Sequence, residues 1–277
     1  MRLLGLYREK ECSPGRHQSN DTLLLEAVAD HLRARGSQVE LTTIDRRSGP
    51  DERLVFSMCQ GRAALERLLE WERGGARIVN SPNSALNTYR DRLAMVMAKA
   101  GVAFPRTELI ATSGHSPFRT GGFWLKRGDV HASVTSDVQW IDSPAAFESG
   151  CADFHSRGIT AAAVQEHRAG DEIKFYGVAA NSFFHWFYSG NARDYAFDRA
   201  ALVRLASRAA EAAGLEIYGG DVIVSPDGEL TLIDLNDWPS FAPCRDAAAE
   251  AIADYLTRRA HVAWNPGLVS SANQSAL

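Results

Sequence analysis

The chain has 277 residues, of which 45% are hydrophobic and 23% charged, a composition that fits one large globular domain or two to three small lobes. Its net charge of −4 argues against a general nucleic-acid or anionic-membrane binder, and no apolar run approaches the ~20 residues that span a bilayer. The chain begins with charges that do not suit a signal peptide, and Cys12, Cys59, Cys151 and Cys244 lack metal or disulfide spacing, so we expect a cytoplasmic protein with reduced thiols and no nucleic-acid or membrane partner.

Short apolar runs and amphipathic segments alternate over the first eighty residues. The pattern predicts helices at Asp21–Arg35 and Ala63–Glu72, and strands at Leu3–Tyr7, Val39–Ile44, Leu54–Cys59 and Arg77–Asn80. Glycines follow both helices, where glycine commonly ends a helix. Strands separated by helices of this length indicate βαβ units and a mostly parallel sheet. We therefore assign residues 1–83 to a small open α/β lobe.

A helix is predicted next at Ala85–Ala100, begun by the cap residues of Asn80-Ser-Pro-Asn-Ser84 and ended by Gly101. The pattern then changes to strands around a helix at Pro144–Arg157. These strands are expected at Arg106–Ile110, Phe123–Lys126, Val138–Ile141 and Ala161–Glu166. We assign residues 84–165 to a central lobe.

The rest of the chain is expected to contain two hairpins and two helices. The first hairpin joins Ile173–Ala179 to Phe183–Phe187, and the helices are Arg199–Ala213 and Arg245–Arg259. We interpret the aromatic run Phe183–Tyr188 as core, because the chain is acidic and no basic residues interleave with the rings as in a nucleic-acid platform. Residues 166–264 are assigned to a C-terminal lobe, and residues 265–277 to a disordered tail.

The most informative segment is the second hairpin, which runs from Asp221 to Phe241 around a Ser-Pro-Asp-Gly turn. Asp221 is expected to open its first strand, and Asp234 and Asn236 to close its second, so that three oxygen ligands meet at one end. Such donors suit Mg²⁺, which takes its remaining ligands from nucleotide phosphates and water. The alternative interpretation is a hairpin with solvated acidic ends.

Two lysines and one bend could complete a nucleotide site. Lys126 leaves an apolar strand and could place its ammonium on phosphate oxygens, or it could simply reach water. Lys174, on a later strand, could point to the same phosphates. The segment Gln165-Glu166-His167 ends a buried strand whose backbone could contact an adenine edge, and Asp171 could bind ribose hydroxyls; an ordinary strand and turn is the alternative.

The order of these residues resembles that of the ATP-grasp superfamily. The chain carries, in that superfamily's order, Asn80-Ser-Pro, Arg90-Asp-Arg92, Lys126, Gln165-Glu-His, Lys174, Asp221 and Asp234-Leu-Asn236. The stretch from Ile78 to Thr107 is similar to the start of the ATP-grasp module in glutamate-adding and glutathione-synthetase-like ligases. The segment Asp234-Leu-Asn-Asp-Trp-Pro239 is similar to the Asp-x-Asn metal motif of inositol-polyphosphate kinases. The resemblance covers roughly residues 1–260 and is strongest from Ile78 onward.

The resemblance implies an α/β fold with an N-terminal α/β lobe, a central lid and a C-terminal lobe that holds ATP between two antiparallel sheets. It implies phosphate contacts and a catalytic role for Lys126, Lys174 and Arg92. It implies further nucleotide contacts at Gln165, Glu166, His167 and Asp171, and two Mg²⁺ ions, or Mn²⁺, at Asp221, Asp234 and Asn236. The chain departs from the pattern at Arg92, where many members have lysine, at Asp234, where ligases commonly have glutamate, and in a lid loop poor in glycine.

The expected function is therefore an ATP-dependent carboxylate–amine ligase that acts through an acylphosphate on a small molecule or peptide. One alternative is a kinase of a small polyol or inositol phosphate, whose anionic substrate would be received by the basic residues Arg8, Lys10, Arg16 and His17. A second alternative is a nucleotide-binding module without catalysis. The substrates and the oligomeric state stay open, with a homodimer as the default. Cys244 follows the metal hairpin and is expected to be a small buried thiol near the site.

Overall fold

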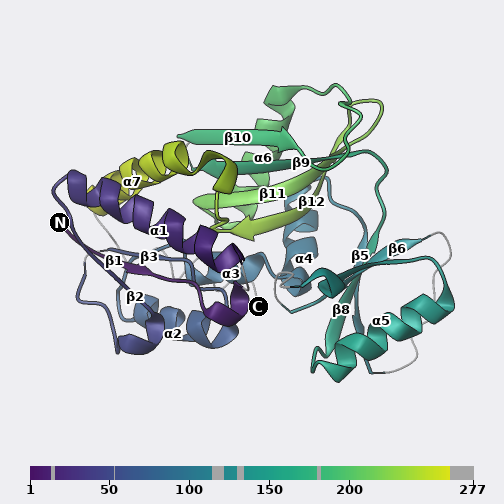
Figure 1. Cartoon of the computed structure of the whole chain (residues 1–277), viewed down its shortest axis with the longest axis horizontal. Helices are drawn as coiled ribbons and strands as arrows, with labels where there is room; N and C mark the ends of the chain where they lie inside the picture. The colour runs from purple at the N-terminus through teal and green to yellow at the C-terminus, as the bar shows by residue number, and fades with distance from the viewer. Residues whose placement is uncertain (14–15, 53, 114–121, 130–133, 180–181, 263–277) are drawn as a thin grey trace.

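The computed structural model of the chain describes residues 1–13, 16–52, 54–113, 122–129, 134–179 and 182–262. Within them the strands form three four-stranded sheets, one parallel and two antiparallel, with helices between and around them (Figure 1). This arrangement confirms the expected α/β fold. The tail expected for residues 265–277 lies outside the described residues. None of the described helices is long and apolar enough to span a bilayer.

The first sheet is parallel, as the alternation of strands and helices predicted. Its strands, in the order β2-β1-β3-β4, are β1 (Arg2–Leu6), β2 (Gln38–Thr42), β3 (Leu54–Ser57) and β4 (Ile78–Val79). Parallel strands need crossover connections, which α1 (Arg16–Ala34) and α2 (Arg62–Arg73) provide. Short 3₁₀ helices lie at η1 (Lys10–Cys12), η2 (Ile44–Arg46), η3 (Thr135–Asp137) and η4 (Ala242–Cys244). The loops that follow β1 and β3 meet at the carboxyl edge of this sheet, where open α/β sheets commonly bind ligands.

The helix predicted over Ala85–Ala100 is in fact two helices, α3 (Pro82–Asn87) and α4 (Arg90–Ala100). The break lies at Tyr89, whose backbone is extended (φ −66°, ψ 142°). The hydroxyl of Tyr89 is buried and donates a hydrogen bond to the carbonyl of Gln60, which holds the break against the first sheet. Arg90 is therefore the first residue of α4.

The middle sheet is antiparallel and is covered by one helix, α5 (Pro144–Ser156). Its strands, in the order β5-β8-β6-β7, are β5 (Thr107–Ala111), β6 (Phe123–Arg127), β7 (Val138–Ile141) and β8 (Ala161–Glu166). Successive residues of a strand point to opposite faces. Phe123 and Leu125 share a buried cluster with Phe154 of α5, so Trp124 and Lys126 face away from that helix.

The last sheet is also antiparallel, and α6 (Arg199–Ala213) covers one of its faces. Its strands, in the order β10-β9-β11-β12, are β9 (Asp171–Val178), β10 (Phe183–Tyr188), β11 (Ile217–Val224) and β12 (Leu230–Asp237). Phe175 and Val222 pack toward α6. The opposite face is directed at the middle sheet across a pocket that both sheets line. We call it the cleft face.

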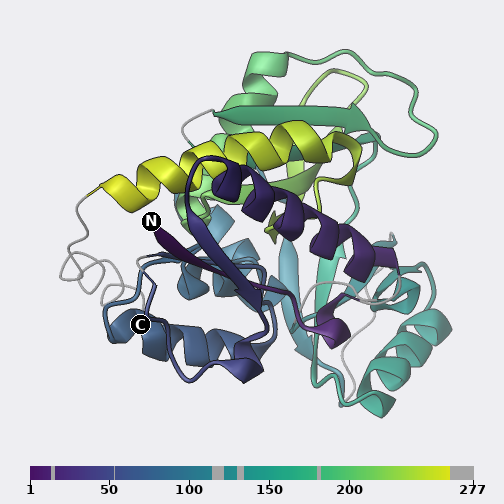
Figure 2. The ribbon, with the colours of Figure 1, turned by 60° about the vertical axis from the view of Figure 1, so that its left-hand side comes forward.

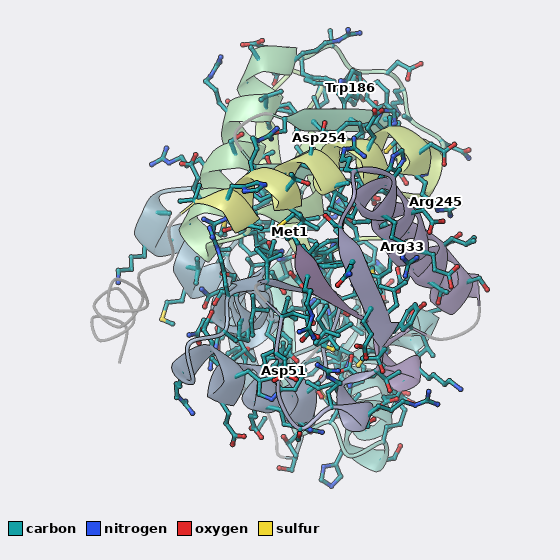
Figure 3. The ribbon with its side chains drawn as sticks, turned by 90° about the vertical axis from the view of Figure 1, so that its left-hand side faces the viewer. Met1, Arg33, Asp51, Trp186, Arg245 and Asp254 are labelled. Carbon is teal, nitrogen blue, oxygen red and sulfur yellow. The ribbon has the colours of Figure 1, made fainter. Side chains whose placement is uncertain are left out.

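The last helix joins the two ends of the chain. Helix α7 (Arg245–His261) packs side by side with α1 (Figures 1 and 2), and Figure 3 looks onto both helices, with Arg245 marking the start of α7. Phe56 of β3, Ile217 of β11 and Ile252 of α7 belong to one buried cluster. The N-terminal lobe and the last sheet thus share a core, and the lobe boundaries after residues 83 and 165 stay predictions.

Candidate active site

The three oxygen ligands expected from the second hairpin lie on one face of the last sheet. Asp221 of β11 pairs directly with Asp234 of β12, and Gly219 pairs with Asn236 two residues further on. Directly paired residues, and residues two apart on a strand, project from the same face. Both carboxylates and the amide therefore face the cleft, although the sequence alone could not establish the pairing.

Asp221 does not open its strand, as the sequence had suggested. Strand β11 begins four residues earlier, at Ile217. The adjacent glycines Gly219 and Gly220 lie within the strand, at positions where a side chain would meet neighbouring atoms. A Cβ atom on Gly220 would come within 2.7 Å of the Phe175 ring, and one on Gly219 would come within 3.0 Å of the Tyr176 ring.

A β-bulge changes the direction in which side chains project at this point of the hairpin. Asp221 pairs with Asp234, whereas the next residue, Val222, pairs with Leu232, so β12 has one additional residue, Ile233. Ile233 lines the same pocket as Asp234. The bulge therefore brings an apolar and a charged side chain to the pocket side by side, an arrangement that is common next to active sites.

Lys174 lies beside Asp221 on the neighbouring strand β9. Its Nζ atom is 2.9 Å from Oδ1 of Asp221 and 2.9 Å from Oε1 of Glu172. Burial alone would lower the pKa of Lys174, but the two carboxylates outweigh it and raise that pKa above its ordinary value. Burial also raises the pKa of Asp221 to about 6, an effect that Asp234 and Glu172 strengthen and Lys174 opposes. Sequence reasoning did not place Glu172 in the site. The available signal was its position two residues before Lys174 on a strand, which puts both side chains on one face.

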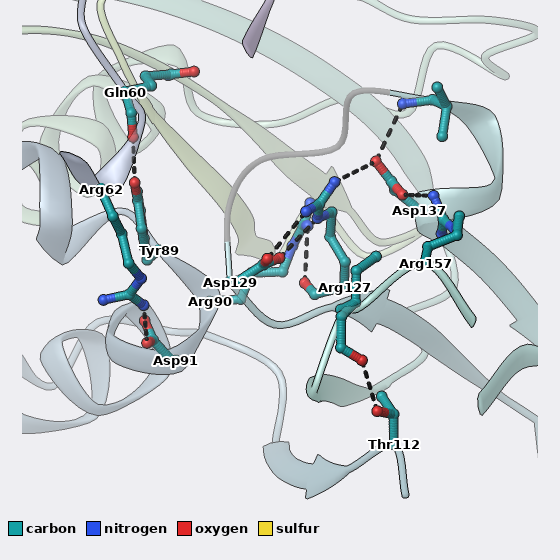
Figure 4. Close-up of polar contacts among 12 residues, drawn as sticks. Gln60, Arg62, Tyr89, Arg90, Asp91, Thr112, Arg127, Asp129, Asp137 and Arg157 are labelled. Carbon is teal, nitrogen blue, oxygen red and sulfur yellow. Dashed lines mark hydrogen bonds and ion pairs between the residues drawn. The ribbon is translucent and has the colours of Figure 1, made fainter. Parts of the chain in front are cut away.

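Two cations face these carboxylates from across the pocket. Lys126 of β6 is buried, and burial lowers its pKa to about 8 although the Asp234 carboxylate acts in the opposite direction. Arg90 of α4 is also buried; its Nη2 atom lies 3.7 Å from Oδ2 of Asp234, and its Nη1 donates to the carbonyl oxygen of Arg127 at 3.2 Å (Figure 4). Sequence reasoning placed Lys126 here but missed Arg90.

A small, partly open pocket lies between the two antiparallel sheets. Its charged end is formed by Arg90, Lys126 and Asp234. The remaining lining is apolar or neutral and consists of Leu93, Ala94, Phe104, Thr107, Ala163, Gln165 and Ile233. The lining thus combines two cations and a carboxylate with mainly apolar side chains.

Arg92, which the resemblance assigned to the phosphates, is not among the residues that line this pocket. The lining residues of α4 are Arg90, Leu93 and Ala94, at spacings of three and four, which is one face of a helix. Arg92 is two residues from Arg90 and therefore projects from another side. The spacing of Arg90, Leu93 and Ala94 on one helix face is the sequence signal that favours Arg90, rather than Arg92, as the residue that faces the pocket.

The carboxyl end of β6 carries a closed ionic network next to Arg90 (Figure 4). Arg127 binds both carboxylate oxygens of Asp129, at 2.7 and 3.0 Å, and one oxygen of Asp137 at 3.3 Å. Asp137 is completely buried and also accepts a hydrogen bond from Arg157 at 2.8 Å. Because these charges satisfy one another, the network anchors the end of β6, and with it Lys126, rather than offering a separate ligand site.

The residues expected to contact the nucleotide base lie where β8 ends. Gln165 is buried in the pocket and donates to Oγ1 of Thr107 at 3.3 Å. Glu166 and His167 are exposed, and Nδ1 of His167 accepts a hydrogen bond from the indole of Trp124 at 3.2 Å. The backbone of this segment stays the predicted base contact. We call residues 167–170, between β8 and β9, the hinge segment.

Asp171, the expected ribose ligand, has other partners. Its Oδ2 atom accepts hydrogen bonds from the backbone N–H groups of Arg193, at 2.9 Å, and Tyr195, at 3.0 Å. The side chain is buried. It thus fixes the loop after β10 to the start of β9, and its contact with ribose stays a prediction.

The other end of the cleft face is joined to the N-terminal lobe by buried hydrogen bonds. Nδ2 of Asn80 donates to Oδ1 of Asp237 at 2.6 Å, and Oδ1 of Asn80 accepts from the backbone of Ile217 at 2.9 Å. Burial raises the pKa of Asp237 to about 7. Arg8 donates to the carbonyl of Trp238 at 2.6 Å and lies 3.5 Å from Asp21. Asn80 and Arg8 therefore hold the lobes together.

The donor set fits a hard divalent cation that also binds phosphate. Asp221, Asp234 and Asn236 supply two carboxylates and an amide oxygen, whereas Mg²⁺ takes six oxygen ligands and retains several waters. Among the described residues no group of three or more His, Cys, Asp or Glu side chains could hold a metal by itself. The protein oxygens suffice only if phosphate and water complete the shell.

No family model matches the chain, and no curated protein matches its sequence. Solved structures do match its fold. The RimK-domain ATP-grasp protein of Sphaerobacter thermophilus superposes with a TM-score of 0.66 at 19% identity, over 93% of this chain and 100% of that one. A D-alanine–D-alanine ligase of Bacillus anthracis gives 0.71 at 11% identity, over 94% and 97% of the two chains. The ATP-grasp ligase PsnB, in complex with minimal precursor, Mg and ADP, gives 0.63 at 16% identity, over 94% and 96%. The protein has the ATP-grasp fold.

Proposed function

We propose that this ATP-grasp protein is an ATP-dependent ligase that joins a carboxylate to an amine through an acylphosphate. The observation that carries the proposal is that Asp234 shares one pocket with Lys126 and Arg90, and that Asp221 and Asn236 lie on the same sheet face as Asp234. Asp221, Asp234 and Asn236 line the cleft face of the last sheet, and Lys126 and Arg90 lie on the other side. The ligases among the matched structures support the reaction class by analogy of fold.

The pocket suggests how ATP would lie. Its base would occupy the apolar end near Gln165 and Phe104, where the hinge segment offers backbone groups. Its triphosphate would extend between Lys126 and the carboxylates of β11 and β12. Bound Mg²⁺, which we propose as two ions held by Asp221, Asp234 and Asn236, would neutralise charge on the transferred γ-phosphoryl group.

Two balanced steps would form the product. First, a carboxylate oxygen of the acceptor attacks the γ-phosphorus, and the bond to the β,γ-bridging oxygen breaks so that its electron pair leaves with ADP. Second, the amine nitrogen attacks the carbonyl carbon of the acylphosphate, phosphate leaves with the electrons of the C–O bond, and the nitrogen loses a proton. Lys126, Arg90 and Lys174 would stabilise the charge on the phosphates, and no protein nucleophile is required.

The kinase alternative was supported by the Asp-x-Asn motif and by a basic N-terminal segment that could receive an anionic substrate. Arg8 is instead occupied by backbone carbonyls and Asp21, and Lys10 is exposed on η1. The side chains of Arg16 and His17 lie outside the described part of the chain. A substrate that carries several phosphates needs several available cations, so the occupied Arg8 favours the ligase.

The test uses hydroxylamine as a general amine. The protein is incubated with ATP, MgCl₂, hydroxylamine and a panel of amino acids, short peptides and polyol phosphates, and both ADP and hydroxamate are measured. A ligase forms hydroxamate and free phosphate with a carboxylate acceptor. Asp234→Asn should reduce the rate by more than about 100-fold, whereas Asp227→Asn, an identical change in the exposed hairpin turn, should not.

Two results would contradict the proposal. A product that keeps the phosphate, identified by mass spectrometry with a polyol or inositol phosphate, would establish the kinase. ATP binding without ADP formation from any acceptor would favour the non-catalytic module.

A further inference from the structure

The residues on the cleft face of the last sheet form rows that follow one another from the hinge segment toward the N-terminal lobe. In that order, the rows set by strand pairing are Glu172 with Ile223, Lys174 with Asp221 and Asp234, and Tyr176 with Gly219 and Asn236. The pocket reaches the middle row at Asp234 and is also lined by Gln165, close to the hinge segment. A triphosphate at the middle row therefore leaves the third row for the group that attacks the γ-phosphate.

The third row continues into an aromatic surface on β9 and β10. His185 pairs with Tyr176, and Phe187 pairs with Lys174, so both face the cleft. The ring centroids of Tyr176 and Phe187 are 6.2 Å apart, and those of His185 and Phe187 are 6.0 Å apart. All three side chains are half-buried. We call Tyr176, His185 and Phe187 the aromatic floor.

The interpretation of Phe183–Tyr188 as core holds for four of its six residues. Only alternate residues of β10, namely Phe184, Trp186 and Tyr188, pack toward α6. Phe183 packs against the buried ring of Phe241 at 6.2 Å. His185 and Phe187 lie on the other face of β10 and, like the rest of the strand, are only half-buried.

The aromatic floor is not a site for a strongly charged group. Strands β9 and β10 are described throughout, and their charged cleft-facing residues are Glu172 and Lys174, which pair with each other at 2.9 Å. What remains is a partly apolar surface, bordered by the ring of Phe241, whose centroid lies 5.1 Å from that of Tyr176. Such a surface suits a ring linked to a carboxylate, because the ring gains contact with aromatic faces and edges while the carboxylate extends toward the γ-phosphate at the middle row.

We propose that the acceptor, whose carboxylate is phosphorylated, carries an aromatic ring a few bonds from that carboxylate, and that this ring packs on Tyr176, His185 and Phe187. The inference rests on the proposed ligase function. Neighbouring strands lie about 4.8 Å apart and successive residues about 3.3 Å apart, so Tyr176, Phe187 and His185 are about 8 to 12 Å from Asp221 along the sheet. A short linker between ring and carboxylate spans that distance.

The experiment combines turnover with binding. Hydroxamate formation is compared for L-phenylalanine, L-tyrosine, L-leucine and L-glutamate, each free and as the last residue of an Ala-Ala-X tripeptide. We expect kcat/KM about tenfold higher for the aromatic probes than for leucine, since aromatic pairs add to simple burial. Binding of the same probes to the protein with Mg²⁺ and a non-hydrolysable ATP analogue is followed by saturation-transfer NMR of the ring protons.

Matched variants on one strand test the location. Phe187→Leu should raise KM for aromatic probes several-fold and reduce the ring-proton signal, with an unchanged dissociation constant for the ATP analogue. Trp186→Leu removes a larger ring from the opposite face of β10 (Trp186 is labelled in Figure 3) and should leave the preference intact. Thermal unfolding of both variants shows whether each is folded.

The outcomes separate the inference from the proposed function. Leucine or glutamate probes that bind and react as well as the aromatic ones, or a preference that survives Phe187→Leu, would overturn the inference while the ligase stands. Ring-proton binding that Phe187→Leu abolishes, without any hydroxamate, would keep the aromatic site and remove the ligase function. Absence of binding by every aromatic probe would overturn the inference.

Discussion

Lys174 and Asp221 occupy paired positions on β9 and β11, and the ammonium of Lys174 lies 2.9 Å from one carboxylate oxygen of Asp221. A second cation, Arg90, lies 3.7 Å from Asp234. The proposed metal ligands are thus paired with the same cations that would bind phosphate. With Lys126 and Glu172, this cluster comprises three cations and three carboxylates, so its formal charge is zero.

This balance predicts that metal and nucleotide bind together. A divalent cation alone would have to compete with Lys174 and Arg90, and unbalanced buried charge is unfavourable. Two divalent cations and ATP⁴⁻ together add no net charge. We expect Mn²⁺ to bind at least about tenfold more tightly when an ATP analogue is present, as measured by the free Mn²⁺ signal in electron paramagnetic resonance.

Lys174→Met should strengthen the binding of Mn²⁺ in the absence of nucleotide. The difference between the Mn²⁺ affinities with and without the ATP analogue should therefore become smaller. Lys99→Met, on the exposed side of α4, serves as the control. Equal Mn²⁺ affinity with and without nucleotide in the unmodified protein would show that the pairing does not control metal entry.

Arg90 and Arg92 give a direct comparison within one helix. We expect Arg90→Met to weaken binding of the ATP analogue by about 10- to 100-fold, because a hydrogen bond to a charged group contributes about 1.5–3 kcal/mol. Arg92→Met should change the dissociation constant by less than about threefold, the size of an ordinary surface effect. Isothermal titration calorimetry measures both. A larger loss in Arg92→Met would mean that α4 presents its other side to the nucleotide.

The buried ammonium of Lys126 should make nucleotide affinity depend on pH. Burial lowers its pKa to about 8, so the side chain is charged below that pH and loses its proton above it. Phosphates favour the charged form and raise the pKa in the complex, so binding above pH 8 requires proton uptake. The dissociation constant should rise up to about tenfold per pH unit above 8.

Calorimetry in buffers of different ionisation enthalpy would detect the proton uptake. Lys126→Met should weaken binding at every pH and remove this part of the pH dependence. A dissociation constant that is constant between pH 7 and 9.5 in the unmodified protein would contradict the prediction.

Asp237 should make the stability of the fold depend on pH. Burial raises its pKa to about 7, well above the ordinary value of 3.8. Between these values the folded state holds a proton that the unfolded state has released, so this group's contribution to stability falls as pH rises from about 4 to 7 and stays lost above it. Asp237→Asn keeps an oxygen for Asn80 without the charge.

We expect Asp237→Asn to increase the free energy of unfolding by roughly 1 to 3 kcal/mol at pH 8, and to have little effect at pH 4, near the ordinary pKa, where the aspartic acid is neutral in the folded state and about half neutral in the unfolded state. Urea unfolding at the two pH values measures the difference. An equal effect at both would show that lost packing or hydrogen bonding, rather than charge, is responsible.

Much of the fold was predictable because its signals are local. The strand predicted at Ala161–Glu166 and the helix at Arg199–Ala213 have the bounds observed in the structure, since hydrophobic periodicity and caps lie within the segment itself. The helix break at Tyr89 was not predictable. It depends on a hydrogen bond to Gln60, which is distant in sequence.

The sequence by itself determined which chemical groups are available and in what order: oxygen donors at Asp221, Asp234 and Asn236, and the strand lysines Lys126 and Lys174. Only the tertiary structure decided which of them meet. The pairing of Asp221 with Asp234 depends on the register of two strands and on a bulge, and a shift of one residue would turn either carboxylate to the α6 face. Arg90 reaches Asp234 from a helix more than a hundred residues away in the chain, and no local pattern specifies a contact between segments that only folding brings together.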